Sequence, residues 1–334
     1  MARGKLTLRV LAGLTAFALA GLTACGTGGG APGASGGGGE KKAIGVSVAD
    51  QKSLFYVAAV QGMQAQAEKR GYKLVVTSAN NNSSQQVSQV NDLLTQQVGA
   101  LIFTSQDSTA AAAGVKAANK AQVPVIAVDQ RPESGQGELA TYIATDSVKA
   151  ARELCTWMFQ QRGGSGEIAI LHGVLGSTAE IQRTQGCQEA IKATPGIKVV
   201  AEETANWDET EAFKATQNIL AAHPQLKAVF GESDAMGLGA AKAAQQANRH
   251  DGMQFVGIDG FPTMFDGVKA GLTQATMAQQ PYHMGEIAVD NAIQIMEGGA
   301  ALPAEQYQDT VLINKDTVDQ NDVTKFYGPN AKSS

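Results

Sequence analysis

The chain has 334 residues, with 26 lysines and arginines against 31 aspartates and glutamates and a formal net charge of −5. No run of basic residues follows the N-terminal segment, so this charge pattern argues against nucleic acid as a partner. About 290 residues remain beyond that segment, enough for two domains of ordinary size.

The first 24 residues have the order of a secretory signal peptide. Three basic residues precede an apolar run at 10–22, and this run is too short for a membrane-spanning helix, which needs about 20 apolar residues. Cys25 directly follows Leu-Thr-Ala, a sequence that resembles the lipobox of bacterial lipoproteins. We therefore expect residues 1–24 to be removed and Cys25 to carry a lipid that anchors the protein to the outer face of the cell membrane.

A flexible linker is expected at 25–40, between the lipidated cysteine and the folded part. Residues 26–39 are Gly with some Ala, Ser and Thr and one Pro, a composition that cannot bury a core. The folded part then begins near Lys41.

Two further cysteines, Cys155 and Cys187, lie in the folded part. An even number of cysteines in an exported chain permits a disulfide. Both lie in helical patterns of the same half of the chain. A bridge between them and two buried free thiols are both compatible with the sequence.

Short apolar runs in the first half predict buried strands. They lie at 44–48, 74–77, 101–104 and 125–129. Helical spacing of apolar or alanine residues separates them, and glycines follow the first two helical patterns, as expected at helix ends. These patterns lie at 57–70, 87–94 and 110–121.

The second half repeats this order. Its apolar runs lie at 168–173, 198–202, 228–231 and 254–259, and the first two runs begin 30 residues apart in both halves. Alternating strands and helices predict parallel sheets covered on both faces. The predicted fold class is thus α/β, with two similar doubly wound parallel-sheet lobes and a ligand cleft at the carboxyl ends of the strands.

Motifs of enzymes that use this fold class are absent from the sequence. There is no Gly-x-Ser-x-Gly, no phosphate-binding P-loop and no Gly-x-Gly-x-x-Gly after a strand. The four histidines lack metal-ligand spacing. We therefore expect no catalysis, no cofactor and no metal.

A series of short segments runs in one order from Ile44 to Val311. They are FY at 55–56, GY at 71–72, PVI at 124–126 leading into Asp129, Arg183 at a helix start, WD at 207–208, HP at 223–224, SD at 233–234, GIDG at 257–260 and QQP at 279–281. In this order they resemble the ribose-type periplasmic sugar-binding proteins.

This resemblance implies three crossings between the lobes, near Thr145, Met277 and Leu302, which form a three-strand hinge. It also implies a cleft that shuts on the ligand by domain closure. We expect a monomer. The implied lobes are N-terminal, 41–145 plus 279–305, and C-terminal, 146–278 plus 306–328.

Aromatic residues follow strands in both halves. Phe55 and Tyr56 follow the first strand, and Trp207 follows the second strand of the other lobe. Rings stack on the apolar C–H faces of a sugar, so we expect rings from opposite lobes to enclose the ligand. The alternative for Phe55 or Tyr56 is packing in the lobe core.

Polar residues after the strands are the candidates for binding hydroxyl groups. The resemblance implies this role for Asp129, Arg183, Asp259 and Gln279. Further candidates occupy positions where ribose binders carry asparagine (Ser53, Thr104 and Ser233) or arginine (Gln130), so the particular sugar stays open. Arg131 is a candidate for the missing guanidinium, or else a surface charge. Asp50, Asp234 and His172 are second-tier candidates.

The charges of the predicted cleft nearly balance, since two aspartates face one or two arginines, and this favours a neutral ligand. We expect an extracytoplasmic solute-binding protein that delivers a neutral sugar or polyol to an ABC permease and its ATPase. The alternative is a module that presents a small signalling molecule to a membrane sensor.

Overall fold

The computed structural model describes residues 43–109, 112–133 and 135–331. The expected signal peptide, Cys25 and the expected linker at 25–40 lie outside these residues. Within the described ranges, no helix combines the length and the apolar character that a membrane crossing requires.

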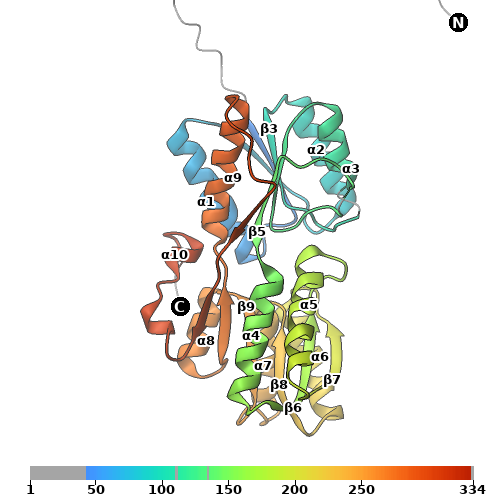
Figure 1. The fold of residues 1–334 in the computed structure, drawn as a ribbon, viewed down its shortest axis with the longest axis vertical. Helices are drawn as coiled ribbons and strands as arrows, with labels where there is room; N and C mark the ends of the chain where they lie inside the picture. The colour runs from blue at the N-terminus through green and yellow to red at the C-terminus, as the bar shows by residue number, and fades with distance from the viewer. Residues whose placement is uncertain (1–42, 110–111, 134, 332–334) are drawn as a thin grey trace, which may run out of the picture. The chain divides into compact units, whose positions relative to one another are not determined.

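The N-terminal lobe, which carries the labels β3 and β5 in Figure 1, is built on a six-stranded sheet with the strand order β11-β5-β4-β3-β1-β2. All of its neighbouring strands are parallel. The four predicted strands of this half are present, and two strands that the apolar pattern did not reveal complete the sheet. The strands are β1 (Ile44–Val48), β2 (Leu74–Ser78), β3 (Ala100–Phe103), β4 (Val125–Val128), β5 (Thr141–Thr145) and β11 (Glu305–Gln308).

The C-terminal lobe repeats this sheet with the order β12-β10-β9-β8-β6-β7. Only the edge strand β12 runs antiparallel to its neighbour in this sheet. The predicted repeat of one architecture is therefore present in the sheets. The strands are β6 (Ser165–His172), β7 (Gly196–Thr204), β8 (Leu226–Gly231), β9 (Gln254–Asp259), β10 (Ala275–Ala278) and β12 (Val311–Asn314).

Helices cover both faces of the N-terminal sheet. Strand β3 shows why, because Ile102 packs with the apolar residues of α1 and α9 while Leu101 and Phe103 pack with those of α2 and α3. A strand with apolar residues on both faces needs helices on both sides. The helices are α1 (Leu54–Arg70), α2 (Ser83–Thr95), α3 (Ala112–Lys120) and α9 (Pro281–Met296).

The C-terminal sheet is covered in the same way. Ile170 packs toward α4 and α5, and its neighbour Leu171 packs toward α6 and α7. A disulfide joins Cys155 on α4 to Cys187 on α5, which is one of the two alternatives that the sequence left open. The helices are α4 (Ser147–Gln161), α5 (Thr178–Ala193), α6 (Glu209–Ala222), α7 (Asp234–Gln246) and α8 (Pro262–Ala270).

The chain passes between the sheets three times. The first two passages run from β5 to α4 and from β10 to α9. The third lies between β11 and β12, after Gln308, and not near Leu302 as predicted. The reason is that the polar strand β11 pairs with β5 and therefore belongs to the N-terminal sheet.

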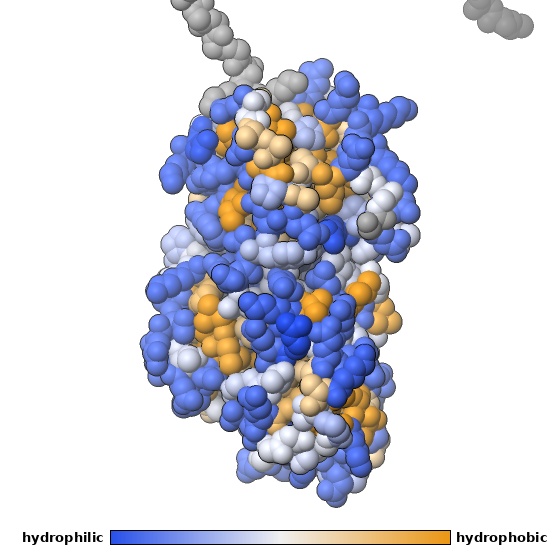
Figure 2. Space-filling model, in the orientation of Figure 1, coloured by the Kyte–Doolittle hydropathy of each residue, from blue (hydrophilic) through white to orange (hydrophobic). Residues whose placement is uncertain are grey.

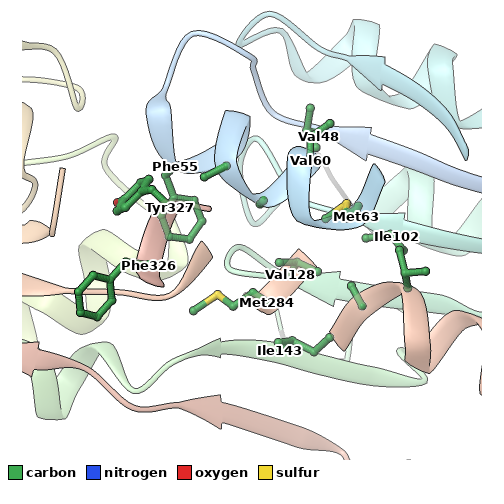
Figure 3. Packing of buried hydrophobic residues seen from close by; sticks show 14 of the residues in the cluster. Val48, Phe55, Val60, Met63, Ile102, Val128, Ile143, Met284, Phe326 and Tyr327 are labelled. Carbon is green, nitrogen blue, oxygen red and sulfur yellow. The ribbon is translucent and has the colours of Figure 1, made fainter. Parts of the chain in front are cut away.

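The C-terminal segment lies against both lobes. It forms a short 3-10 helix η1 (Val318–Gln320) and α10 (Thr324–Tyr327), and α10 contacts both α1 and α9. Phe326 and Tyr327 belong to the same buried apolar cluster as Phe55 of the N-terminal lobe and Phe261 of the C-terminal lobe (Figure 3). Residues beyond the last strand are thus part of the core.

Candidate functional site

Residues after the strands of both sheets line one cavity of about 660 Å³. A doubly wound sheet presents its ligand site at this edge. Ten of the twelve predicted ligand-binding residues line the cavity: Ser53, Phe55, Tyr56, Asp129, Gln130, Arg183, Trp207, Ser233, Asp259 and Gln279. The second-tier candidate Asp50 lines it too.

The other two predicted residues, Thr104 and Arg131, do not line the cavity. Thr104 is buried behind it, and its backbone bonds to Ser47 and to the Gln86 side chain. Arg131 forms an ion pair with Glu305 of β11 at 2.6 Å, and its guanidinium lies 4.4 Å from the centre of the Tyr142 ring. Neither side chain lines the cavity, and the roles of Thr104 and Arg131 in ligand binding stay predictions.

Asp259 and Arg183 form the buried polar centre of the cavity. Asp259 Oδ1 accepts a hydrogen bond from Gln279 Nε2 at 2.8 Å and lies 3.5 Å from Arg183 Nη1. Arg183 also donates to the carbonyl oxygen of Glu232 at the end of β8. These bonds hold the guanidinium in one orientation at the carboxyl edge of the C-terminal sheet.

Two polar atoms at this centre have no partner among the described residues. They are Arg183 Nε and Gln279 Oε1, and both are buried. Burying a polar group without a hydrogen bond is unfavourable. A donor and an acceptor so placed are available to the hydroxyl groups of a ligand, which both donate and accept.

Burial raises the pKa of three carboxyls at or behind the cavity. Burial raises the pKa of Asp259, and the nearby Arg183 guanidinium opposes that rise. Asp234 lies behind Asp259, and burial together with the Asp259 charge raises its pKa further. Burial also raises the pKa of Asp129, against the opposing effect of Arg183. Burial thus makes ionisation of all three carboxyls less favourable than in water.

Trp207 supplies the aromatic face from the C-terminal lobe. The backbone of Trp207 has a φ of 64°. The guanidinium carbon of Arg183 lies 5.5 Å from the centre of the Trp207 ring. The indole packs directly on Gly173, where a Cβ would lie 2.0 Å from ring carbons. Only glycine at position 173 leaves the ring in this place.

Two aromatic residues face the cavity from the N-terminal lobe. Tyr56 is partly buried, and its hydroxyl donates to Asp129 Oδ2 at 3.3 Å. Phe55 lies edge-on to Tyr56, with 5.5 Å between ring centres, and is also part of the apolar core. Phe55 thus both lines the cavity and packs in the core of the lobe.

Gln130 and Ser233 line the cavity but already have hydrogen-bond partners. Gln130 Oε1 accepts the backbone N–H of Ala179 from the other lobe at 3.4 Å. Ser233 caps α7 by accepting the N–H of Met236 at 3.4 Å. Their contributions to ligand binding stay predictions.

His172 lies behind the cavity in a cluster of carboxylates. Its Nδ1 is 3.2 Å from Glu232 Oε1, and its Nε2 is 3.0 Å from Glu202 Oε2. Among the described residues, His172, Glu180 and Glu232 are the one group whose donor atoms lie close enough together to hold a metal ion. Glu232 accepts the N–H of Gly173 at 2.8 Å, so the cluster supports the glycine on which Trp207 packs.

The ion pair of His172 predicts a pH-dependent stability. Hydrogen bonding to Glu232 raises the pKa of His172 to about 9, against an opposing effect of burial. Because the pKa of His172 is higher in the folded state than its unfolded value of about 6.5, protonation of His172 stabilises the folded state fully below pH 6.5. This stabilisation is lost as the pH rises to 9. We expect the melting temperature of the wild type to exceed that of His172→Gln by a constant amount below pH 6.5. Differential scanning calorimetry should show the difference shrinking between pH 6.5 and 9; a difference that grows with pH would contradict the ion pair.

Several lining residues were not among those predicted from the sequence. They come from the helix starts and loops that surround the cavity. For example, Asp208 caps α6 by accepting the N–H of Glu211, a signal that the sequence does contain. The missed residues are Ala49, Lys52, Leu54, Asn81, Gln106, Val174, Ser177, Ala179, Asn206, Asp208, Glu209, Glu211, Ala235, Leu238, Phe261 and Thr263.

Two α/β lobes with this strand order, and a polar and aromatic cavity lined by both, define a two-lobe binding protein. Residues 44–300 match the family described as periplasmic binding protein domain, and the chain belongs to this family.

Individual relatives are similar along most of the chain. The chain is 34% identical to the ribose import binding protein of Bacillus subtilis (strain 168) over 262 residues, 78% of this chain and 84% of the relative. It is 36% identical to the xylitol-binding protein of Mycolicibacterium smegmatis over 233 residues, 70% of this chain and 66% of the relative.

A similar solved structure is an ABC transporter solute-binding protein from Bacillus halodurans C-125 with bound myo-inositol. The two chains are 26% identical and superpose with a TM-score of 0.79. The match covers 84% of this chain and 96% of the chain from Bacillus halodurans. The fold and the sequence thus agree on the family.

Proposed function

We propose that this protein is an extracytoplasmic solute-binding protein that captures a neutral sugar or polyol and delivers it to an ABC permease with its ATPase. The observation that carries the proposal is the cavity with rings from both lobes around a buried guanidinium, carboxylate and amide centre. Such a centre suits a ligand that offers both C–H faces and hydroxyl groups. The protein acts by binding and not by catalysis.

The relatives support a hydroxyl-rich neutral ligand. Ribose and xylitol appear in the names of the relatives, and myo-inositol is bound in a solved structure. These molecules share adjacent hydroxyl groups on a short carbon skeleton and carry no charge. The cavity agrees, because its lining holds carboxyls together with the cations Arg183 and Lys52.

Hinge closure is the proposed working motion. Ligand contacts from Tyr56 on one lobe and Trp207 on the other form together only when the lobes approach. The lobes already meet at the edge of the cavity, where Thr178 Oγ1 donates to the carbonyl oxygen of Arg131 at 3.2 Å. The three passages of the chain between the sheets are the proposed hinge.

The N-terminal segment supports a location outside the cytoplasm. We propose that a signal peptide at 1–24 is removed and that Cys25 becomes a lipid anchor, with 25–40 as a tether.

The face of the molecule in Figure 2 is mostly hydrophilic, and its apolar residues form separate patches. We propose that the protein is a monomer.

A thermal-shift panel tests the proposed ligand class. Ribose, xylitol, allose and myo-inositol are compared with ribose 5-phosphate as the anionic control, each at millimolar concentration. At least one neutral compound is expected to raise the melting temperature, because a ligand that binds only the folded state stabilises it. The phosphate ester should give no shift, since carboxyls outnumber the cations Arg183 and Lys52 in the cavity lining. A shift with the phosphate ester alone, or with none of a full set of pentoses, hexoses and alditols, would contradict the proposal.

A further inference from the structure

The two cavity aspartates share an unusual backbone. Asp129 has a φ of 62° and Asp259 a φ of 151°. Asp129 directly follows β4 and Asp259 is the last residue of β9, and these two strands hold equivalent places in the strand orders. Positive φ at a residue other than glycine is uncommon and persists where the surroundings enforce it.

A buried tyrosine hydroxyl bonds to each of these aspartates at the same atom. Tyr142 donates to the carbonyl oxygen of Asp129 at 2.5 Å, and Tyr327 donates to that of Asp259 at 2.9 Å. The tyrosines are 1% and 3% exposed. Burial raises the pKa of both hydroxyls well above the usual value, so both stay protonated and able to donate.

The two tyrosines come from unrelated parts of the chain. Tyr142 lies on β5, the strand next to β4, whereas Tyr327 lies on α10 in the C-terminal segment. The repeat of the two lobes therefore does not account for the shared contact. Two independent elements supply the same bond at the same place, which points to a requirement of the aspartates themselves.

Each tyrosine ring is itself held in place. The Arg131 guanidinium lies over the Tyr142 ring at 4.4 Å, and Phe261 packs edge-on to the Tyr327 ring at 5.7 Å between centres. A fixed ring gives its hydroxyl a fixed position. This also provides a role for Arg131, which lies outside the cavity.

We propose that Tyr142 and Tyr327 are positioning residues for ligand binding, which hold Asp129 and Asp259 in a backbone conformation that directs their carboxylates into the cavity. The proposal rests on the proposed function for the nature of the ligand. Without the hydroxyl, the Asp129 carbonyl loses the bond from Tyr142, and the Asp259 carbonyl keeps only the bond from the Gln279 N–H. The aspartate then relaxes toward negative φ, which turns the carboxylate away. The C-terminal segment thereby becomes part of the binding machinery through Tyr327.

Calorimetric titration of Tyr142→Phe and Tyr327→Phe with the panel compound that shifts the wild type most tests the proposal. Each variant is expected to bind about 3- to 10-fold more weakly, the loss of one hydrogen bond. Tyr72→Phe is the matched control, because its hydroxyl bonds to Glu297 on the surface at 2.8 Å. Its affinity should equal that of the wild type.

Double-mutant cycles separate positioning from a general loss of structure. In an Asp129→Ala background, Tyr142→Phe should cost no further affinity, whereas in an Asp259→Ala background it should cost its full 3- to 10-fold. Tyr327→Phe should cost no further affinity in the Asp259→Ala background and its full 3- to 10-fold in the Asp129→Ala background. Equal losses in both backgrounds would overturn the proposal, since they would mean that the tyrosines act through stability alone.

Crystal structures of the two phenylalanine variants without ligand give a second, ligand-independent test. We expect the φ of Asp129 or Asp259 to become negative in the corresponding variant. An unchanged backbone with an unmoved carboxylate would overturn the positioning role. If the wild type binds no member of the panel, the proposed function fails, and these structures still decide the role of the tyrosines.

Discussion

Replacing Trp207 with alanine is expected to lower the affinity for the ligand at least tenfold, a loss of about 1.4 kcal/mol or more. The indole is the ring that the C-terminal lobe contributes to the cavity, and it also lies over the Arg183 guanidinium. Its loss uncovers an apolar face of the ligand and lets water reach the buried polar centre. Calorimetric titration with the panel compound that binds the wild type measures the change.

A second variant tests the same contact from the other side. Gly173→Ala leaves the indole in the chain but places a Cβ where the ring now lies, so the ring must move and the affinity should fall as well. Trp157→Phe is the control, because it changes the other tryptophan of the chain, which lies outside the cavity lining. Wild-type affinity in both Trp207→Ala and Gly173→Ala would discard the cavity as the ligand site.

The strands that could be predicted from the sequence are those with continuous apolar runs. Strands β1, β3, β6 and β8 are buried on both faces, so their composition alone identifies them. Strand β11 has the sequence Glu-Gln-Tyr-Gln and lies at a sheet edge, where no apolar pattern is required. Its pairing with β5 is a contact between distant parts of the chain, and the predicted place of the third passage was wrong for that reason.

The candidate site was predictable where a residue directly follows a strand. Asp129 and Asp259 lie at strand ends, and parallel strands bring their carboxyl ends to one edge; the family resemblance implied their binding role. Arg131 also follows a strand, but its partner Glu305 is 174 residues away, and no local signal indicates that pairing. Position in the chain thus predicts which edge a side chain reaches, and tertiary contacts decide where it points.

The positions of Tyr327 and His172 could not be predicted from the sequence for a related reason. Tyr327 lies beyond the last strand and carries no motif, yet its hydroxyl reaches the carbonyl oxygen of Asp259 across 68 residues of sequence. His172 was a candidate for the cavity itself, and instead it lies behind Gly173, bonded to Glu232. Both residues act through a neighbour, and a sequence pattern does not record such indirect contacts.

Reduction of the Cys155–Cys187 disulfide is expected to lower the free energy of unfolding by about 3 to 4 kcal/mol, the chain-entropy value for a loop of this size. The cysteines are 32 residues apart in sequence and join α4 to α5, with their Cα atoms 5.4 Å apart. Urea unfolding with and without reductant measures the effect. The double variant Cys155→Ala, Cys187→Ala is the control, since reductant should not change its midpoint.

Ligand affinity should change much less than stability on reduction, although α5 carries Arg183. The two helices are also held by Gly186, which lies so close to α4 that a Cβ would be 2.2 Å from the carbonyl oxygen of Val148. This close packing keeps α5 in place without the bridge, because it depends on the absence of a side chain and not on the sulfurs. A midpoint that reductant leaves unchanged in the wild type would contradict the stabilising role, and a loss of affinity as large as that of Trp207→Ala would show that the bridge positions Arg183.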